Sequence, residues 1–200
     1  MNETILVLAT RNRHKVAEIS SILKGAGVRI VSLEDFKGAP EVVEDGKTLK
    51  ANAVKKARAI ALYCKQWALA DDTGLEVSRL GGEPGVYSAR WAGEGCSYDD
   101  NNKKLLAELD GVSKTKRGAD FKCVIALSSP SGKVKCVEGQ INGFIAFKEK
   151  GAKGFGYDPL FVVPKYGKSF AQLSSLIKNK ISHRARALKK AKILIKQMLV

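Results

Sequence analysis

The stretch FKCVIALSSPSGKVKCVEGQINGFIAF, residues 121–147, carries the pattern that decides the fold class. Two segments with β-branched and aromatic residues, 121–127 and 133–147, flank the turn Pro130-Ser131-Gly132. Runs of this kind, separated by turn residues, predict a β-hairpin. A long hairpin in the middle of the chain therefore predicts a sheet that contains antiparallel strands.

The segments around this hairpin alternate between strand and helix patterns. Short apolar runs predict further strands at 4–9, 28–33, 67–70 and near Phe161. Apolar residues at helical spacing predict helices at about 13–24, 48–63, 98–109 and 182–199. Glycine-rich stretches predict turns and loops at 81–95 and 151–156. Strands mixed with helices predict an α/β fold with a mixed β-sheet and flanking helices.

The bulk properties are those of a soluble globular protein. The chain has 200 residues, of which 44% are hydrophobic and 28% charged, so it suits one domain or one domain with two lobes. The first apolar run, Ile5 to Ala9, is too short for the core of a signal peptide, and no segment reaches the length of a membrane span. We therefore expect a cytoplasmic protein with no membrane partner.

The four cysteines are widely spaced and include no C-x-x-C pair. This spacing disfavours a zinc site, and a cytoplasmic location disfavours disulfides. Cys123 and Cys136 could still face each other across the hairpin, which the sequence leaves open.

Basic residues greatly outnumber acidic ones. Lys and Arg total 35 against 20 Asp and Glu, giving a formal net charge of +15. Such an excess attracts polyanions, including nucleotides and nucleic acid, although most of these lysines fit a solvated surface.

Two segments in the first third of the chain suit phosphate and metal chemistry. Residues 10–15 lie between a predicted strand and a predicted helix, where backbone N–H groups and the helix dipole favour an anion. Glu44 precedes a helix on which Asn52 and Lys56, four residues apart, share one face. Each segment could equally be an ordinary capped turn.

The segment Ala70-Asp71-Asp72-Thr73-Gly74-Leu75 places two adjacent carboxylates at the end of a predicted strand. Buried carboxylates are costly unless they bind something. Magnesium prefers a few carboxylate oxygens together with phosphate and water, so we favour a metal site here over a simple turn.

Two later segments suit a purine base. Gly154-Phe155-Gly156-Tyr157-Asp158-Pro159 is a glycine-flanked loop whose aromatic rings offer a stacking face, although core packing is an equal alternative for Tyr157. Residues 178–184, KNKISHR, gather hydrogen-bond donors at the entry to the last predicted helix.

In this order, the segments resemble the inosine triphosphate pyrophosphatase family, the non-standard purine nucleotide pyrophosphatases. The resemblance covers nearly the whole chain. It rests on the following matches: Thr10, Asn12 and Lys15 in T-x-N-x-x-K; Asn52, Ala53, Lys56 and Ala57 in N-A-x-x-K-A; residues 70–75; residues 81–90, GGEPGVYSAR; residues 155–159; and residues 181–184, ISHR.

The resemblance implies a single domain over residues 1–200, elongated, with two lobes around a central nucleotide cleft, and a homodimer. It implies hydrolysis of ITP, dITP and XTP at the α-phosphorus to the monophosphate and pyrophosphate, which cleanses the nucleotide pool. The implied metal ligands for Mg²⁺ are Asp72 and Glu44, and the implied catalytic residues are Asp72 as base with Lys15 and Lys56 at the pyrophosphate. The implied substrate contacts are Thr10, Arg11, Asn12, Arg13, His14, Lys15, Thr73, Phe155, Gly156, Tyr157, Asp158, Lys178, His183 and Arg184.

One position departs from the family pattern. Relatives commonly have T-F-x-E-N-A where this chain has Thr48-Leu49-Lys50-Ala51-Asn52-Ala53, so the carboxylate before Asn52 is replaced by Ala51. This departure shifts the metal and base roles toward Asp72, Asp71 and Glu44.

Two rival functions remain at this point. One is a pyrophosphatase for other modified nucleotides, which a substrate panel would distinguish from a pyrophosphatase for ITP, dITP and XTP. The other is a nucleic-acid-binding domain, suggested by the net charge of +15 but not by any recognised motif, and aromatic residues make up only 7% of the chain.

Overall fold

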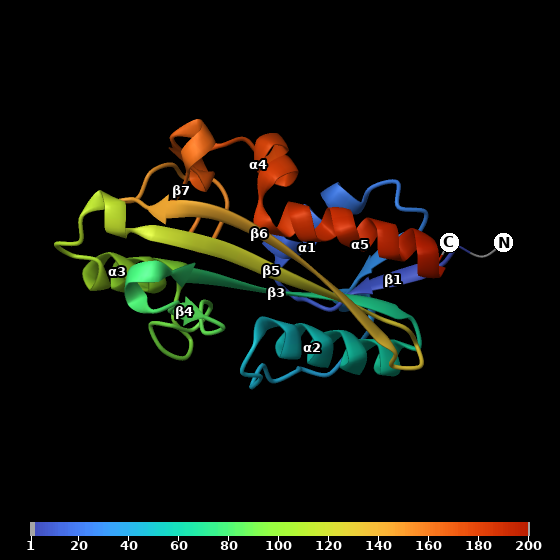
Figure 1. The fold of residues 1–200 in the computed structure, drawn as a ribbon. Helices are drawn as coiled ribbons and strands as arrows, with labels where there is room; N and C mark the ends of the chain where they lie inside the picture. The colour runs from blue at the N-terminus through green and yellow to red at the C-terminus, as the bar shows by residue number, and fades with distance from the viewer. Residues whose placement is uncertain (1–2, 200) are drawn as a thin grey trace. The chain divides into compact units, whose positions relative to one another are not determined.

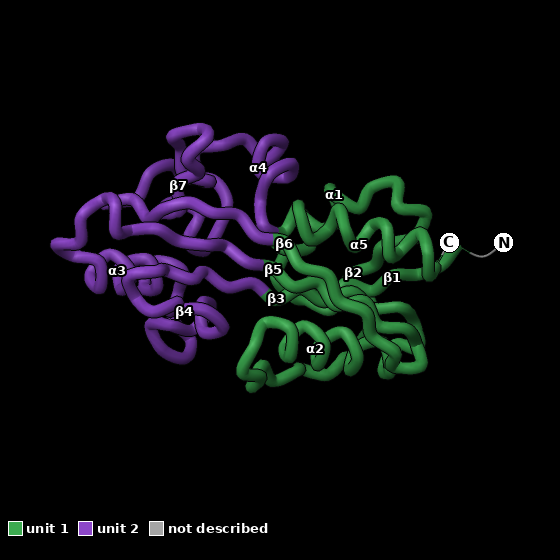
Figure 2. Tube along the Cα trace, in the orientation of Figure 1, with its two compact units in different colours: residues 1–72, 123–139, 184–200 green, residues 73–122, 140–183 purple. Residues whose placement is uncertain are grey.

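The computed structural model describes residues 3–199, and the chain divides into two compact units. Unit 1 comprises residues 1–72, 123–139 and 184–200, and unit 2 comprises residues 73–122 and 140–183 (Figure 2). Three long strands, β3, β5 and β6, contribute residues to both units.

Figure 1 shows the helices and strands of the chain, with a run of strands, β5 to β8, between α3 and α4. The strands are β1 (Ile5–Leu8), β2 (Arg29–Ser32), β3 (Trp67–Val77), β4 (Pro84–Gly85), β5 (Gly118–Ser128), β6 (Val134–Ile145), β7 (Phe161–Val163) and β8 (Lys168–Ser169). The α-helices are α1 (Arg13–Leu23), α2 (Leu49–Cys64), α3 (Tyr98–Glu108), α4 (Ser175–Ile181) and α5 (His183–Leu199).

Within the described residues, the strands pair in the order β2-β1-β3-β5-β6-β7-β8, with β4 added to β3. β1 is parallel to both β2 and β3, whereas β3–β4, β6–β7 and β7–β8 are antiparallel. The expected mixed sheet with flanking helices is therefore confirmed.

Unit 1 has an apolar core on each face of its strands. On one face, α1 and α5 pack against alternate strand residues such as Leu69 of β3 and Ile125 of β5. On the other face, α2 packs against Ala68 and Ala70 of β3. Figure 1 shows α2 on one side of these strands and α5 on the other. The side chains of β3 thus alternate between two helical layers.

The core of unit 2 is aromatic as well as aliphatic. Leu105 and Leu109 of the α3 segment pack with Phe121, Phe161 and Phe170. The rings of Phe121 and Phe161 lie 4.9 Å apart, and those of Phe161 and Phe170 lie 5.2 Å apart. These contacts anchor α3 to the strands of this unit.

The structure corrects the expected elements in two places. The strand expected at 67–70 continues to Val77, because residues 71–77 also pair in the sheet, so the two aspartates lie inside a strand. A separate short helix, α4, precedes the last helix, and Ser182 lies at the break between them. The central hairpin is present as β5 and β6.

All four cysteines are free thiols. Cys123 belongs to the core under α1 and α5, whereas Cys136 packs against the core under α2. The two side chains therefore point to opposite faces of the strands in unit 1, which explains why they form no disulfide.

None of the helices within residues 3–199 combines the length and apolar character needed to cross a membrane.

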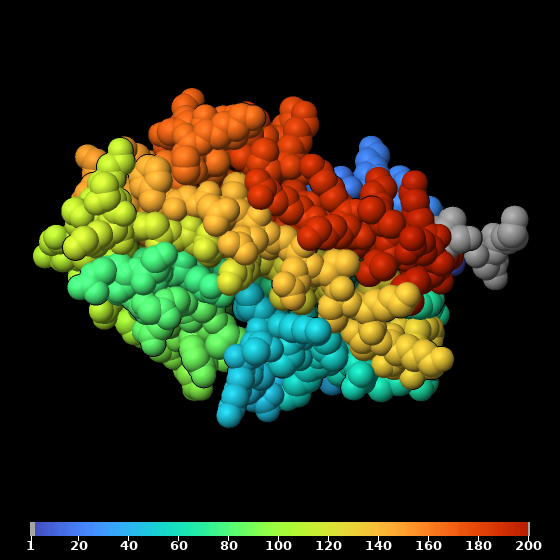
Figure 3. Space-filling model, in the orientation of Figure 1, coloured from blue at the N-terminus to red at the C-terminus, as the bar shows by residue number. Residues whose placement is uncertain are grey.

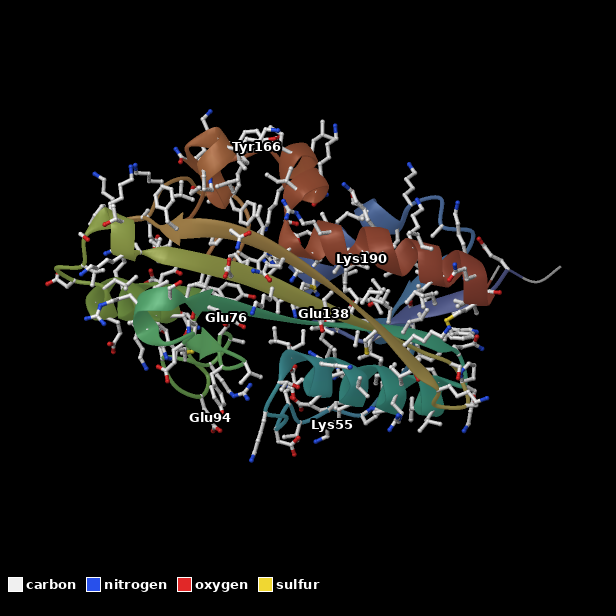
Figure 4. All side chains as sticks on the ribbon, in the orientation of Figure 1. Lys55, Glu76, Glu94, Glu138, Tyr166 and Lys190 are labelled. Carbon is white, nitrogen blue, oxygen red and sulfur yellow. The ribbon has the colours of Figure 1, made fainter. Side chains whose placement is uncertain are left out.

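Helix α5 exposes basic side chains and contains no acidic residue. Its exposed basic positions are Arg186, Lys189, Lys190 and Lys196. Figure 3 shows this helix, in red, on the surface of unit 1. Figure 4 shows Lys190 and Glu138 close together, and the Lys190 ammonium donates to the Glu138 carbonyl at 2.8 Å.

This basic face predicts weak nucleic-acid binding that depends steeply on salt. Four lysine or arginine contacts to the phosphates of a single strand would lose roughly fiftyfold in affinity between 50 and 200 mM salt, because counterions are released on binding. We expect fluorescence anisotropy with single-stranded DNA to show that decline, and a Lys189→Glu/Lys190→Glu variant to bind more weakly. Tight, sequence-dependent binding at physiological salt would contradict the expectation.

Candidate active site

Strand β3 directs its two adjacent aspartates to opposite faces of unit 1. Successive side chains of a strand alternate, so Asp71 faces α1 and α5 while Asp72 faces α2. Both are buried, with 1% and 6% of their surfaces exposed. The two carboxylates therefore belong to different clusters of charge, although they are neighbours in sequence.

The Asp72 cluster combines two carboxylates with one lysine. The Lys56 ammonium, from α2, lies 3.3 Å from Asp72 Oδ1 and 3.0 Å from Glu44 Oε2. The Lys56 side chain is only 10% exposed, so it is held between the two acids. Lys56 thus reaches the cluster through its position on the buried face of α2, as its spacing from Asn52 predicted.

Burial and the neighbouring Glu44 raise the pKa of Asp72 to about 6, although Lys56 and Lys15 act in the opposite direction. For Glu44, burial is outweighed by the Lys56 ammonium, which lowers its pKa. Glu44 therefore ionises first, and Asp72 keeps its proton to a higher pH than an ordinary aspartate. A carboxylate whose pKa lies near neutrality can exchange a proton with water.

The loop that carries Glu44 is shaped by Asn52. The Asn52 Oδ1 atom accepts a hydrogen bond from the Gly46 N–H at 2.8 Å, and Asn52 is completely buried. A Cβ at Gly46 would come within 2.6 Å of that same oxygen, so only glycine fits there. Asn52 is not among the site residues that the resemblance implies, although its spacing four residues before Lys56 indicates that the two share a face of α2.

The Asp71 cluster is a buried network of ion pairs. Asp71 Oδ2 lies 3.2 Å from the Lys15 ammonium and 3.1 Å from Nη2 of Arg184. The other terminal nitrogen of Arg184 contacts Glu18 Oε2 at 2.5 Å. Burial alone would raise the pKa of Asp71, but Lys15 and Arg184 outweigh it and hold that pKa well below its usual range.

This network includes Arg184, which the resemblance placed among the substrate contacts. The Arg184 side chain is 2% exposed and pairs with Asp71 and Glu18 in unit 1, so it joins α5 to β3 and α1. No local pattern could show this, because Arg184 and Asp71 are 113 residues apart in sequence. Its contact with the base stays a prediction.

The turn before α1 is more fully hydrogen-bonded than the sequence suggested. Asn12 caps the helix, and its side chain accepts from the N–H groups of His14 at 3.0 Å and Lys15 at 3.2 Å. Thr10 Oγ1 accepts from the Asn12 N–H at 3.2 Å. These amides therefore already have protein acceptors, and the Lys15 ammonium remains the charged group that the turn directs toward the aspartates.

The other expected contacts of this segment lie at the surface or hold the backbone. Arg11 donates to the Ala39 carbonyl at 2.7 Å, which ties the turn to the loop after β2. The Arg13 side chain is 89% exposed, and His14 is exposed. Thr73 is half-buried and follows Asp72 in β3, where it begins unit 2.

Unit 2 brings together most of the residues that the sequence assigned to a base. The Lys178 ammonium forms an ion pair with Asp158, and both residues are buried. It also lies 4.9 Å from the ring centre of Phe155 and 5.7 Å from that of Phe170. A buried cation with an acid and aromatic faces makes a site suited to a flat, polar ring.

His183 and Tyr157 are both buried in unit 2, in different settings. The His183 ring stacks on Phe121 at 4.4 Å, with 14° between the planes. Tyr157 packs in the apolar core, and its hydroxyl donates to the Ser88 carbonyl at 3.0 Å. Of the two roles left open for Tyr157, base stacking and core packing, its position fits core packing, because the ring is 4% exposed.

Among residues 3–199, no group of three or more His, Cys, Asp or Glu side chains is placed to hold a metal ion by itself. Glu44 and Asp72 both contact the Lys56 ammonium, and within these residues the Asp72 Oδ2 atom is buried without a hydrogen-bond partner.

Comparison with known proteins assigns the chain that carries these clusters to a family. The model of the Ham1 family matches residues 6–193, a range that contains both clusters. The chain belongs to the Ham1 family. The match to this family confirms the family resemblance that the motifs indicated.

Similar proteins agree with this assignment over nearly their whole length. The chain is 50% identical over 195 residues to a protein of Desulforamulus reducens named dITP/XTP pyrophosphatase, covering 98% of this chain and 97% of that protein. It is 51% identical over 185 residues to a Geobacter sulfurreducens protein with the same name, covering 92% and 93%. The solved structure of a HAM1 protein from Coxiella burnetii is 35% identical, covers 97% of this chain and 99% of that one, and has a TM-score of 0.88.

Proposed function

We propose that this Ham1-family chain hydrolyses ITP, dITP and XTP at the α-phosphorus, releasing the nucleoside monophosphate and pyrophosphate. The observation that carries the proposal is the meeting of the Glu44 and Asp72 carboxyl groups at one ammonium, that of Lys56, at 3.0 and 3.3 Å. One buried acid, Asp72, and one partly exposed acid, Glu44, beside a lysine suit a polyanionic substrate that arrives with a divalent cation. The names of the relatives support the class of reaction and of substrate.

The residues of this cluster fit Mg²⁺. Magnesium needs only one or two protein carboxylates when phosphate oxygens and water complete its shell, and Glu44 and Asp72 would be that pair. When bound, Mg²⁺ supplies a Lewis acid for the phosphate oxygens.

The remaining steps belong to the side chains of unit 1. Asp72 takes the proton of the attacking water, since its pKa of about 6 leaves it ionised at neutral pH yet basic enough to accept a proton. The water oxygen bonds to the α-phosphorus, and the bond from that phosphorus to the pyrophosphate oxygen breaks. Lys15 and Lys56 offset the charge of the departing pyrophosphate.

We further propose that unit 2 selects the base. Hypoxanthine and xanthine present a carbonyl acceptor at position six, where adenine presents an amino donor. Lys178 and His183 are buried donors, so adenine would oppose donor to donor. Each such mismatch costs on the order of 1–3 kcal/mol, and two of them give roughly a hundredfold preference against ATP.

A triphosphate panel tests the function. With purified protein and Mg²⁺, we expect ITP, dITP and XTP to yield pyrophosphate, ATP to react roughly a hundredfold more slowly, and EDTA to abolish turnover. GTP shares the carbonyl, so its rejection should be weaker. Pyrophosphate and orthophosphate are measured separately, because stepwise release of orthophosphate would rule out attack at the α-phosphorus.

A homodimer, implied by the family resemblance, and a cytoplasmic location, expected from the lengths of the apolar segments, stay predictions.

A further inference from the structure

The loop that carries Phe155 is contacted by helix α3, which none of the sequence motifs includes. Tyr98 and Asn102 lie four residues apart on α3 and so share a face of the helix. The Tyr98 ring lies 5.9 Å from the Phe155 ring at an angle of 45°. The Asn102 amide nitrogen donates to the Gly156 carbonyl at 3.3 Å. One helix face thus holds two consecutive residues of the loop.

Asn102 is an unusual choice for its position if its only role is to stabilise the fold. It is 3% exposed, and its Oδ1 atom is buried with no hydrogen-bond partner among the described residues. A buried acceptor without a partner costs stability, and asparagine is also a weak helix former. A leucine would avoid both costs. The bond to Gly156 is therefore the contact that accounts for this residue.

The loop is held on its other side by separate contacts. Asp158 accepts from the Phe155 N–H at 2.9 Å and pairs with Lys178. The Tyr157 hydroxyl donates to the Ser88 carbonyl at 3.0 Å. Gly156 itself has a φ of +61°, in the left-handed region where glycine is favoured. Together with the contacts of α3, these interactions hold residues 155–158 in place.

We propose that α3, through Tyr98 and Asn102, positions Phe155 for the purine base and thereby sets base selectivity. Asn102 is a positioning residue that acts through the Gly156 carbonyl, and Tyr98 supports the Phe155 ring from its side. This inference rests on the proposed function, in which Phe155 and Lys178 form the base site. By this inference, α3, which lies outside every recognised motif, helps to determine the choice of substrate.

Asn102→Leu is the sharpest test, because it removes the donor while filling the same space. If Asn102 were merely structural, the variant would keep its selectivity, with stability equal to or above that of the wild type. If Asn102 positions the loop, the variant should stay equally stable, but its KM for ITP should rise about tenfold with little change in kcat. The ratio of kcat/KM for ITP to that for ATP should fall by a similar factor.

Tyr98 and an exposed neighbour on α3 complete the variant set. Tyr98→Leu should also raise the KM for ITP, and Tyr98→Phe should restore it, because the contact needs the ring and not the hydroxyl. Lys103→Ala changes a solvent-facing residue of the same helix, whose side chain is 71% exposed, and should leave both constants unchanged. Selectivity equal to wild type in both Asn102→Leu and Tyr98→Leu would overturn the proposal.

Amide hydrogen exchange without nucleotide provides a readout that does not depend on activity. In Asn102→Leu, the amides of residues 155–158 should exchange about tenfold faster than in the wild type, while those of β7 stay unchanged. Unchanged exchange at 155–158 would overturn the positioning role. Absence of pyrophosphate release by the wild-type protein would overturn the proposed function instead, and the exchange data would still decide whether α3 orders the loop.

Discussion

Asp72→Asn should lower kcat on ITP by roughly a hundredfold or more and should at the same time stabilise the metal-free protein. The activity falls because an amide cannot accept the proton of the attacking water. It also lacks the negative charge that would bind Mg²⁺ and that pairs with Lys56. The stability rises because the fold disfavours the ionised form of Asp72, as its raised pKa of about 6 shows.

The pH dependence of stability follows from the same pKa. The folded protein holds the proton of Asp72 up to about pH 6, whereas the unfolded chain releases it near the ordinary aspartate pKa of 3.8. The stabilising contribution of Asp72 is therefore complete below about pH 4 and is lost as the pH rises through 6. Between pH 5 and 8 the advantage of Asp72→Asn should grow by roughly 1–2 kcal/mol in urea unfolding with EDTA.

Asp45→Asn is the matched control for this variant. Asp45 follows Glu44 directly, but it is exposed and pairs with Lys55, which also points into solvent. Removing its charge should leave kcat within about twofold, since exposed ion pairs contribute little. If Asp72→Asn kept a tenth or more of wild-type activity, the base and the metal ligand would have to lie elsewhere.

Asp71→Asn should have the largest effect on stability of any conservative change in β3. It removes one of the carboxylates that contact the Arg184 guanidinium, which is 2% exposed, and the carboxylate that lies 3.2 Å from the Lys15 ammonium. Breaking a buried pair from one side costs about 3–5 kcal/mol, because the other charge stays buried. We expect the midpoint of urea unfolding to fall accordingly.

Two further variants show whether the buried Arg184 cation causes the loss of stability in Asp71→Asn. Asp99→Asn breaks an exposed pair with Lys103 and should cost less than about 1 kcal/mol. Combining Asp71→Asn with Arg184→Met should recover part of the loss, since the cation is removed as well. A double variant as unstable as the sum of the two single variants would contradict this explanation.

The sequence by itself determined the class of the fold and the kinds of side chain that the candidate site contains. Period-two and helical patterns are local, so the central hairpin at 121–147 and the helices α1, α2, α3 and α5 could be predicted within a few residues. The order of the motifs around Asp72 and Phe155 was specific enough to indicate the family that the comparison confirmed.

Only the tertiary structure decided which neighbours those side chains have. Asp71 and Asp72 differ in role because β3 continues past them and directs one toward α1 and α5 and the other toward α2. Arg184 pairs with Asp71, a carboxylate 113 residues away in sequence. Asn102 is proposed as a positioning residue because it contacts Gly156, 54 residues away. Burial, ion pairing and pKa depend on residues distant in sequence, and no local pattern encodes them.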